Sequence, residues 1–217
     1  TSFFSENKQH LIEEVIQSRT RHITVVLEDI FQPQNASAVL RTCDCMGVQD
    51  VHIIENNNKF NINPDVELGA AKWLNIYNYN KLTNNTLDAI EQLKDRNYKI
   101  VATTPHKDDI LLEELDISDK LALFFGTEKD GLSNEVLNNA DYFVKIPMSG
   151  FTESFNISVS AAITIYSLTT RLKKNDINWQ LSEEEKIDLK IQWASKIIKM
   201  SDKIIENYLV KNRLKQN

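Results

Sequence analysis

Short runs of β-branched and aromatic residues alternate with helical patterns along the first two thirds of the chain. Six of these runs predict buried strands, because each is short and apolar: Ile23–Leu27, Val51–Ile54, Asn75–Tyr79, Lys99–Thr103, Leu121–Phe125 and Tyr142–Ile146. Between them, the spacing predicts helices over Ala36–Met46, Leu87–Leu93 and Asn134–Asn139, with Asn35 and Ser133 as N-caps. This alternation predicts an α/β domain with a mostly parallel sheet.

The pattern becomes helical towards the end of the chain. A long helix is predicted over 156–174, followed by a polar linker over 175–181. Ser182 and Glu185 form a capping-box pattern, and the apolar spacing that follows predicts an amphipathic helix of about eight turns that a single break could interrupt. We therefore expect three parts: an N-terminal helical extension (1–22), the α/β domain (23–174) and a basic C-terminal amphipathic extension (175–217).

Composition narrows the class of protein. The 217 residues suffice for one domain with appendages, and 41% hydrophobic content is ordinary for a globular protein. The only cysteines, Cys43 and Cys45, lack a second Cys pair or a Cys/His cluster, so neither a disulfide nor a zinc site is expected. No apolar run reaches the ~20 residues of a membrane span, and we expect a cytoplasmic protein.

The net charge of −6 argues mildly against a nucleic-acid partner, but screening makes the local placement of charge decisive. Arg19 and Arg21 form a small basic cluster before the first strand. A larger basic group in the C-terminal helix includes Lys196, Lys199, Lys203, Lys211 and Arg213. Both are candidate RNA contacts, although charge alone leaves solvated surface equally open.

Chemistry in α/β sheets concentrates after the carboxyl ends of strands. After the first strand, Asn35 begins a helix that also carries Arg41 among small and apolar residues, where a guanidinium usually meets an anion or a carboxylate. After the fifth strand, Gly126 allows a sharp turn and Glu128 follows at the sheet edge. Capping, packing and a simple turn are the structural alternatives for these residues.

The loop after the sixth strand is the most unusual stretch. Residues 147–162 are rich in Ser, Thr, Asn, Gly and Ala and lead into a helix N-terminus. Such a loop presents backbone N–H groups that can hold a ligand, although Ser and Asn also favour helix caps.

Together these stretches resemble the three motifs of the SPOUT superfamily, in the branch of tRNA and rRNA ribose 2'-O-methyltransferases. The first motif, N-x-x-x-x-x-R, matches Asn35 and Arg41. The second, F-G-x-E-x-x-G-[LI]-[ST], matches Phe125–Ser133, and the third, I-P-M-x-G followed by S-[FL]-N-[VI]-S-V-[SA]-A-A, matches Ile146–Ala162. The resemblance covers roughly residues 23–174 and is specific because all three motifs occur in order.

The resemblance implies a fold, a cofactor and a partner. It implies that the α/β domain ends in a deep trefoil knot, and that the enzyme works without a metal as a homodimer with its active site at the subunit interface. S-adenosylmethionine would be held at the matching positions Thr103, Gly126, Ile146, Met148, Phe155 and Asn156. Arg41 would contact the target ribose and phosphate of the RNA and help to activate the 2'-hydroxyl. Asn35, Glu128, Asn156 and Ser158 would shape the site around it.

The lengths flanking the motifs favour the branch that methylates guanosine-18 in the tRNA D-loop. An rRNA ribose or another tRNA position remains the nearest alternative. A non-catalytic SPOUT RNA-binding module would have no need of Asn35, Arg41, Glu128 and Asn156 together. A dinucleotide-binding enzyme would carry a G-x-G-x-x-G turn directly after a strand, and none of the predicted strands is followed by this pattern.

Overall fold

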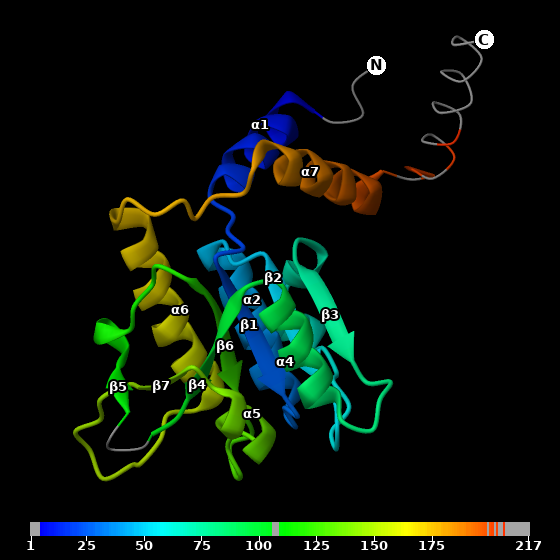
Figure 1. The fold of residues 1–217 in the computed structure, drawn as a ribbon. Coiled ribbons are helices and arrows are strands. Elements are labelled where there is room, and N and C mark those ends of the chain that lie inside the picture. The colour runs from blue at the N-terminus through cyan, green and yellow to red at the C-terminus, as the bar shows by residue number, and fades with distance from the viewer. Residues whose placement is uncertain (1–4, 106–108, 199, 202, 204–205, 207–217) are drawn as a thin grey trace. The chain divides into compact units, whose positions relative to one another are not determined.

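Figure 1 shows a computed structural model of the chain, which describes residues 5–105, 109–198, 200, 201, 203 and 206. The chain divides into two compact units. Residues 20–180 make the larger unit, and the two ends, up to residue 19 and from residue 181, make the smaller one.

A seven-stranded sheet forms the centre of the larger unit (Figure 1). Its strands are β1 (Ile23–Glu28), β2 (Asp50–Ile54), β3 (Asn75–Tyr79), β4 (Tyr98–Thr103), β5 (Ile110–Leu111), β6 (Lys120–Phe125) and β7 (Tyr142–Lys145). They lie in the order β3-β2-β1-β6-β4-β7-β5, and every pairing is parallel. The α/β parallel sheet and all six predicted strands are confirmed. Only the two-residue β5 was not predicted, because it is too short to show a pattern.

Helices cover both faces of the sheet. They are α2 (Pro33–Met46), α3 (Pro64–Glu67), α4 (Asn85–Asp95), α5 (Asn134–Asn139) and α6 (Ile157–Lys174), with short 3-10 turns at Ala70–Lys72 and Leu112–Glu114. Val25 and Leu27 of β1 pack in a core with residues of α2 and α6, whereas Val26 between them packs with α4 and α5. Because neighbouring strand residues point to opposite faces, the strands are buried on both sides, as a parallel sheet requires.

The predicted helix caps hold, with one exception. Gly47 ends α2 in the left-handed region at φ 84°, and the Ser133 side chain accepts the N–H of Val136 at the start of α5. Asn35 is not an N-cap, because α2 begins at Pro33 with Gln32 in the capping position. Pro is favoured in the first helical turn, where its missing N–H costs nothing. The buried Asn35 side chain is thereby available for another contact.

The smaller unit pairs segments from the two ends of the chain. Its helices are α1 (Glu6–Gln17) and α7 (Glu183–Ile197), and the predicted capping box of Ser182 and Glu185 is present. Lys190 of α7 bonds Glu13 of α1, and Trp193 and Ile16 are buried in this unit. The predicted single break falls at Ile198, whose backbone is extended before the helical residues Ser201 and Lys203. Within the described ranges, no helix combines the length and apolarity that crossing a bilayer would need.

His52 is a buried titratable group in the sheet core. Only 1% of the residue is exposed on β2, its Nδ1 lies 2.9 Å from the hydroxyl of Tyr79, and its ring stacks on Tyr77 at 4.8 Å. Burial, and after it the positive charge of Arg96, lowers the pKa of His52 to about 3. The folded state therefore keeps this imidazole neutral at pH values where the unfolded chain, with a pKa near 6.5, protonates it.

We predict that stability falls on acidification because of His52. Between pH 7 and pH 5.5 the unfolded state binds a proton that the folded state does not, which costs about 1 kcal/mol of unfolding free energy. The His52→Phe variant is expected to lose this part of the pH dependence in urea denaturation curves. His10→Phe is the matched control on the exposed side of α1 and should keep the dependence on pH. Equal pH slopes for His52→Phe and the parent protein would contradict the assignment.

Candidate functional site

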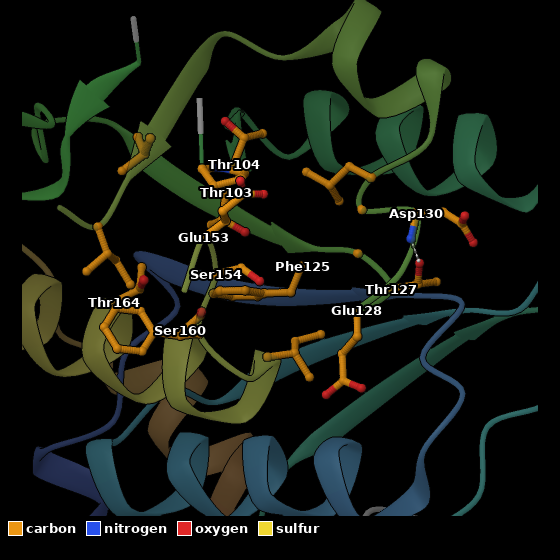
Figure 2. Close-up of a pocket in the computed structure, with 18 of the residues that line it drawn as sticks. Thr103, Thr104, Phe125, Thr127, Glu128, Asp130, Glu153, Ser154, Ser160 and Thr164 are labelled. Atoms are coloured by element: carbon orange, nitrogen blue, oxygen red, sulfur yellow. Dashed lines mark hydrogen bonds between the residues drawn. The ribbon is translucent and has the colours of Figure 1, made fainter. Parts of the chain in front are cut away.

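A cavity of about 470 Å³ opens where β4, β6 and β7 end (Figure 2). Thr103, Phe125 and Val144 line it from the three strands, and the loops that follow β6 and β7 complete the wall. Residues 146–156 after β7 have no regular secondary structure, so their backbone polar groups are not committed to a sheet or a helix. The site thus lies at the carboxyl edge of the sheet, as expected for an α/β fold.

The structure brings the predicted cofactor residues to this cavity. Five of them line it: Thr103, Gly126, Ile146, Met148 and Phe155. The sixth, Asn156, stands between the lining residues Phe155 and Ile157 and directs its side chain to Glu128. Thr103 donates its hydroxyl proton to the carbonyl of Phe124, which ties the end of β4 to β6.

A tight turn between Gly126 and Gly131 shapes one wall of the cavity. Thr127 and Gly131 exchange backbone hydrogen bonds of 2.9 and 3.1 Å, and Gly131 adopts φ 72°. A Cβ atom at Gly126 would lie 2.1 Å from the carbonyl oxygen of Gly131. Both glycines are therefore required by the backbone: the first by close approach and the second by its left-handed conformation.

A polar cluster beside the cavity joins the three sequence motifs. The Glu128 carboxylate accepts hydrogen bonds of 2.7 Å from the Nδ2 atoms of both Asn35 and Asn156. Asn156 also donates to the Asn35 Oδ1 atom at 3.1 Å, and its own Oδ1 accepts from the N–H and the hydroxyl of Ser158. These residues come from α2, the loop after β6 and the start of α6. A carboxylate accepting several donors holds each side-chain amide in one orientation.

A second buried carboxylate fixes the loop that carries Glu128. Glu28, at the end of β1, accepts the N–H and the hydroxyl of Ser133 and the hydroxyl of Thr86. The residue is 3% exposed. Ser133 therefore serves both as the cap of α5 and as the far end of the loop, which gives the 126–133 segment a fixed position against the sheet.

Arg41 lies on the exposed face of α2, away from the polar cluster that Asn35 joins on the same helix. Within the part of the chain that the structure describes, its guanidinium makes no hydrogen bond or ion pair. The sequence predicted that this cation meets an anion, and none of the described residues of its own chain is bonded to it in that role. Arg41 is thus a surface cation available to another molecule.

A second cavity of about 260 Å³ adjoins the first. The two share the loop Thr127–Asp130 and Ile157, and the second extends to Phe31, Gln32 and Asn58. Asn58 belongs to an asparagine run after β2 whose three backbone N–H groups all bond to the carboxylate of Asp29. Sequence reasoning missed this region. The Asn56–Asn58 run at the end of a strand was the available signal.

The predicted basic RNA contacts have mixed positions. Arg19 is only 2% exposed and its guanidinium lies over the ring of Trp193 at 5.3 Å, so the expected surface position is wrong for this residue. Arg21 pairs with the buried Asp50 at 3.2 Å. Lys196 and Lys203 are both exposed, and partial desolvation lowers the pKa of Lys196. Lys199, Lys211 and Arg213 lie outside the described residues.

The larger cavity fits S-adenosylmethionine in size and charge. Its volume lies within the roughly 300–1,000 Å³ of small-molecule sites. Among the described lining residues, the carboxylates of Glu128, Asp130 and Glu153 outnumber one ammonium group, that of Lys129. An acidic wall favours a ligand that carries positive charge, such as a sulfonium with an amino group. The apolar side chains of Leu132 and Ile146 suit the adenine ring.

Comparison with known proteins shows which family the chain resembles. The sequence model of the SpoU rRNA Methylase family matches residues 22–166. The chain is 48% identical over 209 residues to the tRNA (guanosine(18)-2'-O)-methyltransferase of Borreliella burgdorferi, covering 96% of this chain and 94% of the relative.

Solved structures share the fold. The crystal structure of the Aquifex aeolicus TrmH/SpoU tRNA modifying enzyme matches with a TM-score of 0.77 and 30% identity, covering 89% of this chain and 98% of the other. The SpoU methyltransferase AviRb of Streptomyces viridochromogenes, crystallised with AdoMet, matches with a TM-score of 0.63 over 75% of this chain and 65% of its own. At 21% identity, AviRb is similar in fold alone.

We predict that Gly126→Ala weakens S-adenosylmethionine binding by about tenfold or more. The added Cβ would collide with the Gly131 carbonyl, and relieving such overpacking costs ~1–3 kcal/mol by moving the turn. Isothermal titration calorimetry measures the change in affinity. Gly150→Ala is the matched control, because a Cβ there meets only the Thr152 nitrogen at 3.9 Å. Equal affinities for the two variants would show that the turn does not shape the cofactor site.

Proposed function

The chain belongs to the SpoU rRNA methylase family, and from this membership we propose that it methylates the ribose 2'-hydroxyl of guanosine-18 in the D-loop of tRNA. It is an RNA methyltransferase that uses S-adenosylmethionine. The observation that carries the proposal is the Glu128 cluster, which joins all three family motifs beside a cavity that suits this cofactor. The tRNA target is supported by the names of the relatives in Borreliella and Aquifex. We place the reaction in the cytoplasm.

The chemistry requires positioning more than acid catalysis. When bound, S-adenosylmethionine supplies an electrophilic methyl group on a sulfonium, and a ribose hydroxyl must approach it in line while losing one proton. The acidic wall and the irregular loop 146–156 hold the cofactor. Asn35, Glu128 and Asn156 form a preorganised polar surface against which the ribose is oriented.

Arg41 binds the substrate in this mechanism. An arginine is a poor base because its pKa lies above about 12. Its planar donors match a phosphate bidentately, so Arg41 positions the RNA backbone next to the reacting hydroxyl. The proton passes to that phosphate, or to an Arg41 side chain that desolvation has first caused to lose a proton to water. Asn35 and Arg41 leave α2 in different directions, which places the cation outside the polar cluster of its own chain.

We propose that the enzyme is a homodimer whose partner supplies Arg41 to each site. The support is the exposed guanidinium on α2 together with exposed apolar side chains on α6, the helix that packs against α2. Val159 is 43% exposed and Tyr166 60% exposed there. Large apolar side chains on one helix face favour burial against a second copy. The site would then be complete only at the interface.

The expected trefoil knot also stays a proposal. Two observations support it: β6 lies between β1 and β4, and Arg171 of α6 donates hydrogen bonds to the carbonyls of Leu112 and Leu115. These carbonyls belong to the segment that connects β4 to β6. Helix α6 is therefore hydrogen-bonded to the segment that it would have to thread through.

We propose the C-terminal basic residues as the tRNA surface. Lys196 and Lys203 represent it in the structure, with Lys199, Lys211 and Arg213 in the part outside the described residues. Arg19 and Arg21 do not belong to it, because one packs under Trp193 and the other pairs with Asp50. Positive charge on this segment offsets the overall charge of −6 where the RNA phosphates approach.

The function is tested by methyl transfer from labelled S-adenosylmethionine to an unmodified tRNA transcript, with the modified nucleotide mapped. We expect one 2'-O-methyl mark, on guanosine-18. A mark elsewhere in tRNA, or on rRNA alone, would refute the proposed target and keep the chemistry. No incorporation into any RNA, with the cofactor still bound, would favour the non-catalytic RNA-binding alternative.

Mixed dimers test the position of Arg41. We expect Arg41→Ala and Glu128→Ala to be inactive alone, and activity to return when the two variants are denatured together and refolded. A mixed dimer then has one site with both an intact Glu128 and the partner's Arg41. The same refolding of each variant by itself is the control. No recovery, with mixed dimers demonstrated by differently tagged subunits, would place Arg41 in the site of its own chain.

A further inference from the structure

We propose that the second cavity binds the base of the target nucleotide, with Phe31 as its stacking surface and Gln32 and Asn58 as the groups that recognise guanine. This inference rests on the proposed function. The two cavities share Glu128 and the loop Thr127–Asp130, so a nucleotide in the smaller one lies across this loop from a cofactor in the larger. The ribose would then reach the shared wall while its base enters the second cavity.

Phe31 has the exposure that stacking requires. It follows β1 and is 76% exposed, although it lines the second cavity. A flat, exposed aromatic ring beside the side-chain amides of Gln32 and Asn58 suits the face of an unpaired base, because every nucleobase has a π-face to stack. Ile30 and Ile157 give the same cavity an apolar side. The volume of about 260 Å³ suits one base rather than a whole nucleotide.

The orientation of Gln32 follows from the charge on Glu128. The carboxylate can only accept, so Asn35 turns its Nδ2 towards it. The same Nδ2 donates to the Oε1 atom of Gln32 at 3.2 Å. The Nε2 group of Gln32 therefore remains a donor, for which the structure shows no partner among the described residues. It lies on a residue that lines the second cavity.

Asn58 is oriented in the opposite sense. Its Nδ2 donates to the backbone carbonyl of Asp29 at 2.8 Å, and its backbone N–H donates to the Asp29 carboxylate. The Oδ1 atom of Asn58 therefore remains an acceptor, with no partner in the described part of the chain. Asp29 itself is 7% exposed and adopts φ 53°, a left-handed conformation that Asp tolerates. The Asp29 carbonyl thus sets the direction of the Asn58 acceptor, and the Asp29 carboxylate holds the backbone that carries it.

One donor and one acceptor in fixed positions match guanine. Guanine presents the acceptor O6 beside the donors N1–H and N2–H₂ on one edge, so Gln32 can donate to O6 while the Asn58 oxygen accepts from N1–H and N2–H₂. Adenine reverses this edge, with N6–H₂ in place of O6 and an acceptor at N1, so each side chain would face a group of its own kind. A polar site of this kind rejects the wrong base because buried groups are then left unpaired.

Kinetics on tRNA transcripts with guanosine, inosine or adenosine at the target position test this assignment. We expect Phe31→Ala to lower kcat/KM for tRNA roughly 5- to 100-fold, from the lost base stacking, with unchanged affinity for S-adenosylmethionine. Phe31→Tyr should restore the rate. Leu82→Ala is the matched control, since Leu82 is 58% exposed and lines neither cavity.

The Gln32→Ala variant tests the preference for guanosine over adenosine. The loss of one hydrogen bond should lower the rate on guanosine about threefold to tenfold and leave the rate on adenosine unchanged. The ratio of the guanosine rate to the adenosine rate should therefore fall by the same factor. Inosine, which lacks the 2-amino group, should react more slowly than guanosine with the parent enzyme. Unchanged discrimination in Gln32→Ala, or a Phe31→Ala rate equal to that of Leu82→Ala, would overturn the assignment.

Two further results separate the possible failures. If sedimentation shows that Phe31→Ala dissociates the protein into monomers, Phe31 belongs to a subunit interface and the base site is refuted. If the parent enzyme methylates a nucleotide other than guanosine, the proposed function fails, and the guanine assignment fails with it. If the parent enzyme methylates guanosine, and the Phe31 and Gln32 variants keep the parent rate and base preference, the base site is refuted while the proposed function stands.

Discussion

The carboxylate of Glu128 is the contact on which the rest of the site depends. It accepts 2.7 Å hydrogen bonds from two asparagines that lie 93 and 28 residues away along the chain. Neither α2 nor the start of α6 could position such a group alone, because each contributes one short side chain. The turn at Gly126 delivers the carboxylate to both, and Glu28 holds the other end of that turn through Ser133. The site therefore forms only when the three segments meet at the carboxyl edge of the sheet, and no single motif contains it.

The negative charge of Glu128 also sets the orientation of the side-chain amides around it. Because the carboxylate only accepts, the amides of Asn35, Asn156 and Gln32 each have one allowed orientation. Asn58 receives its orientation independently, from the carbonyl of Asp29. Both cavities border the charged loop Thr127–Asp130, but the larger one also meets Glu153 and the irregular loop, whereas the smaller one adds the ring of Phe31 and the amides of Gln32 and Asn58. Adjacent cavities with different chemistry suit two different reactants.

The sequence predicted the elements better than the contacts between them. Buried strands such as Leu121–Phe125 are recognisable from their continuous apolar residues. Gly47 and Ser133 mark helix ends because capping depends on hydrogen bonds and backbone conformation within a few residues. The family motifs then named the residues that the structure brings together. Asn35 was misread as a cap because local rules favour capping, while its partner Glu128 lies 93 positions away. Arg19 was misread as surface, since a charged side chain gives no local sign that Trp193 will cover it. The second cavity was missed because Phe31 and Asn58 meet only after β1 and β2 have paired.

The smaller unit has a consequence for how the protein is made. Helix α1 is synthesised first, yet the helix it packs with, α7, begins at Glu183. During translation, the 20–180 unit can leave the ribosome and begin to fold before α7 has emerged, because domains generally fold as units during synthesis. Until then, the guanidinium of Arg19 lacks the Trp193 ring that it lies against, and the α1 face that carries Ile16 lacks α7. Helix α1, which is synthesised early and has an apolar face without a partner, is the segment of the nascent chain that a chaperone would be expected to bind.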